Sequence, residues 1–381
     1  MVISKTEGTK KLKILLIIIF LALLPVTWVS ANQLGTTFTI HSKHLNEERK
    51  IVVSLPSNYK DEPFYKFPVL YLTDASSQLD HTASMIHYLS DGISPMIVVG
   101  IFTPDRWNEL KPFTRDKQPN PKAESLRKFI VEEVKGFINK NYRTLDYSIF
   151  AGHSLGGSFA INAYIKDATD FDVFFALAPN FAMGNEVMFE QLPNAFAHQK
   201  QPKVYFQFEG VTPFTTPINS YARLNTMLLK YPLLKTTHKV QLFENEDHMT
   251  IPHIGLYRGL TEIYKDWFLY IPSIVEDKKA IKNHFQGLSK RIGYQVNPTE
   301  SYFRDLIGAM ISMEHIDTAA YAAEMAKEFY PESHFSYVLL ADVAHAKKNA
   351  TQEAKWLKKA IMLSSHDVER QSQYQKRLAS L

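Results

Sequence analysis

The chain has 381 residues, of which 45% are hydrophobic, and its formal net charge is +4. This length and apolar content support one or two folded domains with a large core and exclude a disordered chain. The sequence holds no cysteine, so disulfide bonds and thiolate metal ligands are excluded. It has no long run of like charge and no basic patch with interleaved aromatic residues, so no nucleic-acid partner is indicated.

Residues 1–31 carry the pattern of a secretory signal peptide. A basic segment with four lysines precedes an apolar run at 14–24, and Val29 and Ala31 suit a signal peptidase. The apolar run is shorter than the roughly 20 residues that span a bilayer. We therefore expect cleavage after Ala31, a periplasmic or secreted protein, and no stable membrane span afterwards. Removal of four lysines and one glutamate would leave 39 basic and 38 acidic residues, a formal charge of +1.

From about residue 36 to 270, short apolar runs alternate with helical patterns. This alternation predicts an α/β fold with a mostly parallel sheet. Between two of the runs, apolar residues recur at helical spacing over 126–138, and the polar residues 139–141 mark the end of that helix. The expected strands are 38–41, 50–55, 68–72, 96–101, 147–151, 173–177, 204–208 and 240–243.

The pattern changes after Tyr270. Strand-like runs stop, and apolar positions recur near helical spacing up to the C-terminus. A shift of 34 residues aligns Phe303 with Tyr337, and Pro331 stands where the first copy ends. This period resembles that of tetratricopeptide helix pairs, and an ordinary helical bundle is the alternative. The predicted division is a signal peptide at 1–31, an α/β domain at 32–272 and an all-helical, tetratricopeptide-like domain at 273–381.

The segment Gly152-His153-Ser154-Leu155-Gly156 has the pattern G-x-S-x-G. Its glycines leave room for a sharp turn that exposes the serine hydroxyl at the carboxyl edge of the sheet. A chance match occurs in roughly one chain in ten of this length, so the strand-to-helix context matters more than the bare pattern. That context predicts an α/β-hydrolase fold with Ser154 as the nucleophile. The alternative is a turn residue in a glycine-rich loop.

A serine hydroxyl needs a base to take its proton, and in this fold the histidine follows the last strand. The last expected strand is 240–243, and His248 lies in the loop after it. His253 is the rival, a little further along and at an expected helix start. We prefer His248 because it is nearer to the end of the strand.

The acid of a serine triad should follow the strand at 204–208, where Glu209 is the only carboxylate. Asp247 adjoins the histidine too closely in sequence to orient it easily. The alternative is a Ser–His dyad with Glu209 as a surface residue. For the oxyanion hole we expect the backbone amides of Leu155, just after the nucleophile, and of Ala75, in the loop after the strand at 68–72.

Three segments resemble the putative esterase family that contains esterase D and the ferric-enterobactin esterases. They are G-H-S-L-G-G with the later A-P-N-F, the stretch I-V-V-G-I-F-T-P-D-R-W-N-E-L-K-P around Arg106, and the amphipathic helix that ends in N-Y-R-T. The resemblance covers about residues 36–270 and, weakly, the remainder. The segment at 178–183 lacks the family's tryptophans, so one wall of the substrate site is expected to differ.

The resemblance implies an esterase with Ser154 as nucleophile and His248 as base, acting on an acyl or siderophore-like small-molecule ester. We also expect His153, Asp74 and Arg106 at the substrate, and a structural ion pair of Arg106 with Glu109 or another neighbour is the alternative. The sequence holds no metal-ligand cluster and no dinucleotide- or phosphate-binding loop, so no cofactor and no metal are expected.

Two other functions stay open at this point. An acyl-enzyme can pass its acyl group to a sugar or lipid hydroxyl instead of water, which would make the protein an acyltransferase. A hydrolase without its acid could serve as a binding module, with the C-terminal helical region as a surface for a protein partner. The intact G-H-S-L-G-G segment favours a secreted serine hydrolase that cleaves carboxylic esters.

Overall fold

The computed structural model describes residues 34–90, 92–198 and 201–381. The predicted signal peptide and its cleavage site lie outside the described residues. The residues from Leu34 to Leu381 form one compact unit by their contacts, so the predicted boundary at 272/273 stays a prediction. No helix in the described ranges is long and apolar enough to cross a membrane.

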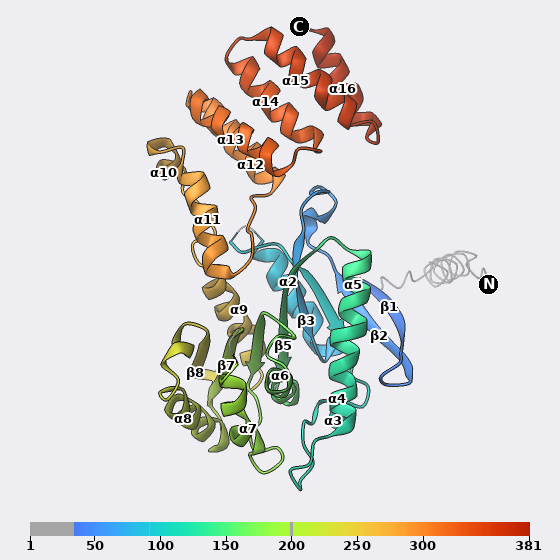
Figure 1. Cartoon of the computed structure of the whole chain (residues 1–381), viewed down its shortest axis with the longest axis vertical. Helices are drawn as coiled ribbons and strands as arrows, with labels where there is room; N and C mark the ends of the chain where they lie inside the picture. Colours follow the sequence, from blue (N-terminus) through green and yellow to red (C-terminus); the bar gives the residue numbers. More distant parts are fainter. Residues whose placement is uncertain (1–33, 91, 199–200) are drawn as a thin grey trace, which may run out of the picture. The chain divides into compact units, whose positions relative to one another are not determined.

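Eight strands form one sheet in the order β1-β2-β4-β3-β5-β6-β7-β8 (Figure 1). β2 pairs antiparallel with both β1 and β4, and all other neighbours are parallel. The expected mostly parallel sheet and all eight expected strands are confirmed. They are β1 (Thr36–Ser42), β2 (Glu47–Ser54), β3 (Phe67–Leu72), β4 (Ile97–Ile101), β5 (Thr144–His153), β6 (Val173–Leu177), β7 (Lys203–Val211) and β8 (His238–Asp247).

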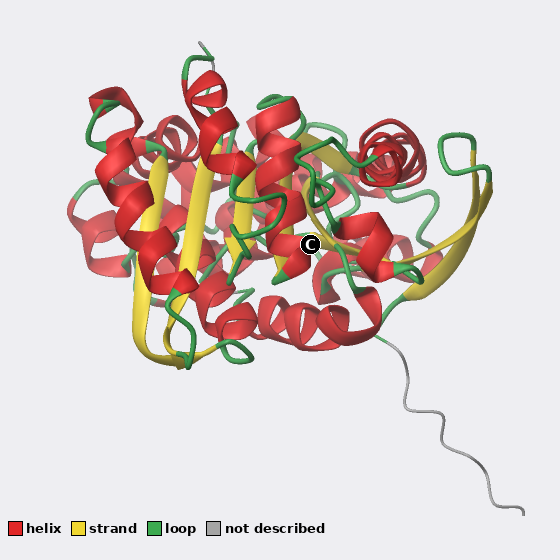
Figure 2. Ribbon diagram, turned by 90° about the horizontal axis from the view of Figure 1, so that it is seen from below, coloured by secondary structure: helices red, strands yellow, loops and turns green. Residues whose placement is uncertain are grey.

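The central strands β3, β4 and β6 are buried at every residue, as expected for parallel strands covered on both faces. α2 (Ala75–Tyr88) packs on β3 and β4 and also meets α9 (Ile251–Ile263), which packs on β5 to β8. α6 (Leu155–Lys166) packs on β5 and β6 beside α7 (Val187–Phe196). Figure 2 shows helices, in red, on both sides of the yellow strands. The other helices of this part are η1 (Ser57–Tyr59), α3 (Arg106–Leu110), α8 (Thr216–Leu228) and η3 (Pro232–Thr236).

The helix expected around 126–138 runs without a break from Pro121 to Asn141. Asn120 caps its start by accepting from the Lys122 amide, and Pro121 occupies the first turn, where no amide is needed. Its middle is a π-helical turn, which the apolar periodicity does not reveal. The three parts are α4 (Pro121–Lys128), η2 (Phe129–Val134) and α5 (Lys135–Asn141).

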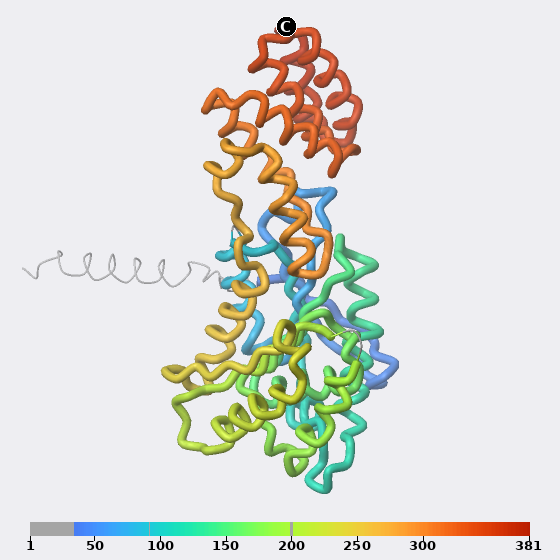
Figure 3. Tube along the Cα trace, turned by 60° about the vertical axis from the view of Figure 1, so that its left-hand side comes forward, coloured from blue at the N-terminus to red at the C-terminus, as the bar shows by residue number. Residues whose placement is uncertain are grey.

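Only helices follow residue 270 in the described chain, as expected. In Figure 3 they form the orange-to-red end of the trace. α12 and α14 begin 34 residues apart, at 300 and 334, and so do α13 and α15, at 316 and 350. This spacing matches the period found in the sequence. The helices are α10 (Ile271–Glu276), α11 (Ala280–Ile292), α12 (Glu300–Ser312), α13 (Ile316–Phe329), α14 (His334–Ala346), α15 (Ala350–Leu363) and α16 (Val368–Ala379).

A buried carboxylate joins the helical region to the α/β part. Glu62 is fully buried and accepts from the backbone amides of Glu300 and Ser301 at 2.8 and 2.9 Å, and from the Ser301 hydroxyl at 2.5 Å. These amides belong to the first turn of α12, which has no acceptors of its own for them. Glu62 therefore caps α12 from a distant part of the sequence.

Candidate active site

Ser154 lies at the sharp turn between β5 and α6. Its φ of 59° and ψ of −115° fall in a region that residues with side chains rarely adopt. Its amide donates to the carbonyl of Leu177 at 2.8 Å, which fixes the turn against β6. The predicted strand–turn–helix arrangement around Ser154 is therefore present.

The glycines that flank Ser154 are explained by close backbone contacts. A Cβ atom at Gly152 would lie 2.1 Å from the carbonyl oxygen of Gly156. A Cβ atom at Gly156 would lie 2.6 Å from the Thr73 hydroxyl, which belongs to the loop after β3. Side chains at these positions would open the turn and push the β3 and β5 loops apart, so the pattern is a steric requirement of this site.

Glu209 and His248 meet at the carboxyl ends of β7 and β8. Glu209 Oε1 lies 3.0 Å from His248 Nδ1. The Glu209 side chain is 6% exposed, whereas the His248 side chain is 45% exposed and reaches solvent. The second Glu209 oxygen is buried and has no hydrogen-bond partner among the described residues. A buried carboxylate that contacts one imidazole nitrogen fixes the orientation of the ring and stabilises its protonated form.

The other two candidates at this loop are engaged elsewhere. Asp247 Oδ1 accepts from the amides of Met249 and Thr250 at 2.8 and 3.1 Å, so this carboxylate shapes the turn before α9. His253 lies in α9, and its ring centre is 5.8 Å from that of His81. The structure therefore brings His248, and not His253, to Glu209.

His153 contacts the main chain of His248. Its Nε2 lies 2.9 Å from the His248 carbonyl oxygen, and the two rings are 4.7 Å apart. A carbonyl only accepts, so His153 Nε2 carries the proton. Burial, together with the neighbouring His248, lowers the pKa of His153 to about 4, so the ring is neutral near neutral pH. The side chain predicted to contact substrate thus holds the loop of the predicted base.

Asp74 and Arg106 pair with each other. Arg106 Nε donates to Asp74 Oδ1 at 2.9 Å, and the same oxygen accepts from the Thr103 hydroxyl at 2.7 Å. Arg106 Nη2 also donates to the His153 carbonyl at 3.3 Å. The partner of Arg106 is therefore Asp74, since Glu109 pairs with Arg49 inside the core. The Arg106 side chain is 43% exposed, which leaves part of its guanidinium available at the surface of the site.

The two predicted oxyanion amides begin helices that follow adjacent strands. Leu155 is the first residue of α6 and Ala75 the first residue of α2. Amides in the first turn of a helix have no acceptor within the helix and lie at the positive end of its dipole. Because β3 and β5 are adjacent and parallel, both helix starts lie at the same edge of the sheet. Asp74 supports this geometry with a left-handed φ of 58°.

Ser158 is a site-supporting residue that the sequence reasoning missed. Its hydroxyl lies 3.0 Å from the Asn180 carbonyl, to which it donates, and it accepts from the Asn180 amide at 2.9 Å. Ser158 thereby links the first turn of α6 to the loop after β6. The available signal was a serine four residues after the nucleophile, where helix geometry returns to the same face. Within the described residues no cluster of three or more metal-ligating side chains occurs.

Comparison with protein families gives one match. Residues 42–208 match the family described as "Esterase: Putative esterase". The match includes Ser154 and ends one residue before Glu209, so the contact between Glu209 and His248 is an observation independent of it. The search of curated proteins found no match.

Solved structures of the same fold cover most of the chain. An IroE-like serine hydrolase from Shewanella oneidensis is 23% identical, with a TM-score of 0.68 over 77% of this chain and 99% of its own. An uncharacterised protein from Capnocytophaga ochracea is 16% identical, with a TM-score of 0.60 over 91% of this chain and 98% of its own. The siderophore hydrolase EstA from Aspergillus nidulans is 19% identical, with a TM-score of 0.53 over 61% and 95%. These likenesses establish the α/β-hydrolase fold.

The class of the protein follows from the fold and the family match together. Its mostly parallel sheet is that of an α/β hydrolase, with a run of helices after it. Residues 42–208 match the putative esterase family, and the protein is an enzyme of the esterase class.

Proposed function

We propose that the protein is a periplasmic or secreted serine hydrolase that cleaves carboxylic esters through an acyl-enzyme. Ser154 is the nucleophile, His248 the general base and Glu209 the orienting acid. The observation that carries the proposal is the 3.0 Å contact of Glu209 Oε1 with His248 Nδ1, at the sheet edge where Ser154 stands. The sequence pattern of residues 1–31 supports export.

In the acylation step, Ser154 Oγ attacks the ester carbonyl carbon while His248 Nε2 takes the hydroxyl proton. The negative charge of the tetrahedral intermediate forms on the former carbonyl oxygen. His248 then gives its proton to the departing alkoxide, so an alcohol leaves and the acyl group stays on Ser154. Water repeats the sequence and releases the acid.

The amides of Leu155 and Ala75 supply the oxyanion hole in this scheme. Each donor in such a site contributes roughly 3 kcal/mol to stabilisation of the transition state. Ser154 itself cannot serve as a donor because its amide is bonded to the Leu177 carbonyl. This leaves the two helix starts as the fitting pair of donors.

The free site is not yet closed for proton transfer. No hydrogen bond joins the Ser154 hydroxyl to His248 in the part of the chain that the structure describes. Such contacts often tighten only when substrate binds. His248 contacts Glu209 through its ring and His153 through its carbonyl, and its imidazole is partly exposed.

The substrate we propose is a small-molecule ester of the acyl or siderophore type. The partly exposed guanidinium of Arg106 fits an anionic group beside the reacting ester. The siderophore hydrolase EstA, a neighbour of the same fold, gives this class priority among the substrates to be tried.

The test is steady-state hydrolysis of p-nitrophenyl acetate, butyrate and octanoate and of a catecholate siderophore ester by the purified protein. We expect turnover by the wild type and by the control Ser273→Ala, which changes an exposed serine in α10. We expect none by Ser154→Ala. Wild-type activity in Ser154→Ala would refute the proposal. If added sugar or lipid alcohols accept the acyl group in place of water, the proposed reaction changes from hydrolysis to acyl transfer.

A further inference from the structure

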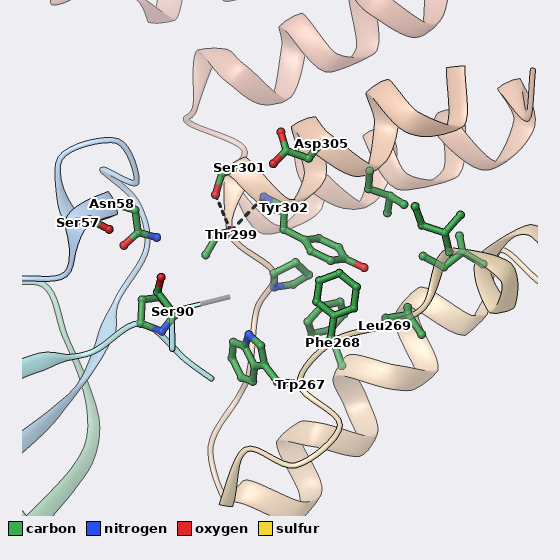
Figure 4. A pocket seen from close by; sticks show the side chains of 16 residues that line it. Ser57, Asn58, Ser90, Trp267, Phe268, Leu269, Thr299, Ser301, Tyr302 and Asp305 are labelled. Atoms are coloured by element: carbon green, nitrogen blue, oxygen red, sulfur yellow. Dashed lines mark hydrogen bonds between the residues drawn. The ribbon is translucent and has the colours of Figure 1, made fainter. Parts of the chain in front are cut away.

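A cavity of about 540 Å³ lies between the α/β part and the first helices of the helical region (Figure 4). Its size is that of a typical small-molecule site. Its walls come from three separate parts of the chain. The lining residues are Ser57, Asn58, Ser90, Pro95, Trp267, Phe268, Leu269, Ile271, Ile274, Phe285, Pro298, Thr299, Ser301, Tyr302, Asp305 and Leu306.

This cavity lies at the opposite edge of the sheet from Ser154. Its Ser57 and Asn58 precede β3, and its Ser90 and Pro95 precede β4. The residues of the candidate active site lie at or just after the carboxyl ends of β3, β5, β7 and β8. Because β3 and β4 run parallel to these strands, segments before and after them stand at opposite edges. The cavity is therefore separate from the esterase site.

One wall of the cavity is aromatic and aliphatic. Trp267 and Phe268 follow α9, Phe285 belongs to α11, and Tyr302 and Leu306 belong to α12. Phe285 and Tyr302 stack edge to face with their ring centres 5.4 Å apart. Phe268 is 59% exposed, unlike most large apolar side chains of this chain. A wall of this kind gains from contact with an apolar body.

The facing wall carries polar side chains, of which Ser57 is exposed and Ser90 partly exposed. Figure 4 shows Ser57 and Asn58 across the space from Phe268 and Tyr302. The side-chain oxygen of Asn58 is buried and has no hydrogen-bond partner among the described residues. In the same described set, the hydroxyls of Ser57 and Ser90 make no hydrogen bond. Accessible hydroxyls across from an apolar wall suit a ligand that has one apolar side and one hydrogen-bonding side.

The charge of the lining limits the ligand further. Among the described residues, no lysine, arginine or histidine lines the cavity, so these residues offer no cationic side chain to an anion. The one carboxylate among the described lining residues, Asp305, is exposed at the edge and contacts Arg304 at 3.2 Å. The lining therefore suits an uncharged molecule.

We propose that this cavity is a second ligand site, distinct from the esterase site. It takes an uncharged amphipathic small molecule. The aromatic or alicyclic body of the ligand packs on Trp267, Phe268 and Tyr302, and its hydrogen-bonding groups face Asn58, Ser57 and Ser90. Because the walls come from both parts of the chain, bound ligand also holds the helical region to the α/β part.

The probe for this site is N-phenyl-1-naphthylamine, an uncharged aromatic amine that fluoresces strongly in apolar surroundings. Its N–H group is a donor for the hydroxyls of Ser57 and Ser90. We expect saturable binding to the purified full chain, unchanged in Ser154→Ala. We expect Ser90→Phe, which fills the cavity from its polar wall, to weaken binding by at least about tenfold. Absence of binding to the wild type would overturn the proposal.

Energy transfer locates the probe independently of Ser90. With tryptophan excitation, probe emission should fall by more than about half in Trp267→Phe, because transfer falls steeply with distance. It should be retained in Trp107→Phe and Trp356→Phe, which change tryptophans outside the lining. If a thermal melt shows that Ser90→Phe is not folded, the energy-transfer experiment decides the outcome. Equal emission in all three variants would place the probe elsewhere and overturn the proposal.

Discussion

Glu209 and His248 are 39 residues apart in sequence, yet Glu209 Oε1 lies 3.0 Å from His248 Nδ1. Two adjacent parallel strands produce this contact. β7 ends just beyond Glu209 and β8 ends just before His248, and the register shift between Glu209 and Val211 lies beside the carboxylate. The pair therefore depends on strand register.

Glu209→Gln should lower kcat for ester hydrolysis by about 10² to 10⁴. A neutral amide cannot stabilise the imidazolium that forms on His248, and it can hold the ring in the wrong tautomer. The measurement is kcat on p-nitrophenyl butyrate. The control is Glu244→Gln, which removes an exposed carboxylate from β8. An equal loss of kcat in both variants, or no loss in either, would show that Glu209 is not the acid of the triad.

His153→Phe should lower kcat by about tenfold and leave KM nearly unchanged, because His153 positions His248 through its carbonyl. The pKa of His153 is lowered to about 4, so this residue is already neutral above pH 5. The acidic limb of the pH–rate profile should therefore persist in the variant. His87→Phe serves as the control. His87 lies near the C-terminal end of α2, and its ring makes a similar hydrogen bond with the carbonyl of Leu55. A rise in KM alone would instead assign His153 to substrate binding.

Glu300→Gln should stabilise the protein at pH 8 and change it little at pH 5. Burial, with the charge of Glu62 nearby, raises the pKa of Glu300 to about 7 from an ordinary value of 4.5. The folded chain therefore keeps this proton between those values while the unfolded chain loses it, so the free energy of unfolding falls as pH rises through this window.

We expect the gain at pH 8 to be about 2 kcal/mol, measured by urea unfolding at both pH values. Glu332→Gln, at an exposed carboxylate, is the control. A gain of the same size at both pH values would contradict the assignment, because an effect of packing would not follow the titration.

Gly152→Ala should abolish activity and destabilise the fold by several kcal/mol, since the added Cβ would lie 2.1 Å from a backbone oxygen. Gly287→Ala is the matched control. A Cβ there meets no atom within 4 Å, in the middle of α11, so up to about 1 kcal/mol of stabilisation is expected. Thermal melts and hydrolysis assays of both variants test directly whether the contact between residue 152 and the Gly156 carbonyl leaves room for a side chain.

Local patterns in the sequence predicted the sheet and the nucleophile turn well. Buried strands such as β6 have short apolar runs with clear ends, and the glycines around Ser154 mark a backbone contact that no side chain could replace. The order of Ser154, Glu209 and His248 along the chain predicted a triad, which stays a prediction; of these residues, Glu209 and His248 are in contact.

Contacts between distant segments could not be predicted in this way. The bond of His153 to the His248 carbonyl and the pair of Asp74 with Arg106 depend on loop geometry, which leaves no periodic signal. The cap that Glu62 places on α12 joins residues 238 positions apart. The tetratricopeptide-like character of the helices and their protein partner stay predictions.

The central claim is that Ser154 is the nucleophile of an acyl-transfer site, and covalent labelling tests it most directly. The purified protein is treated with a fluorophosphonate, and the site and stoichiometry of the adduct are read by intact-mass and peptide mass spectrometry. The account predicts one adduct per chain, on Ser154, absent from Ser154→Ala and slower to form in Glu209→Gln. An unlabelled wild type, or equal labelling of the folded Ser154→Ala variant, would contradict it.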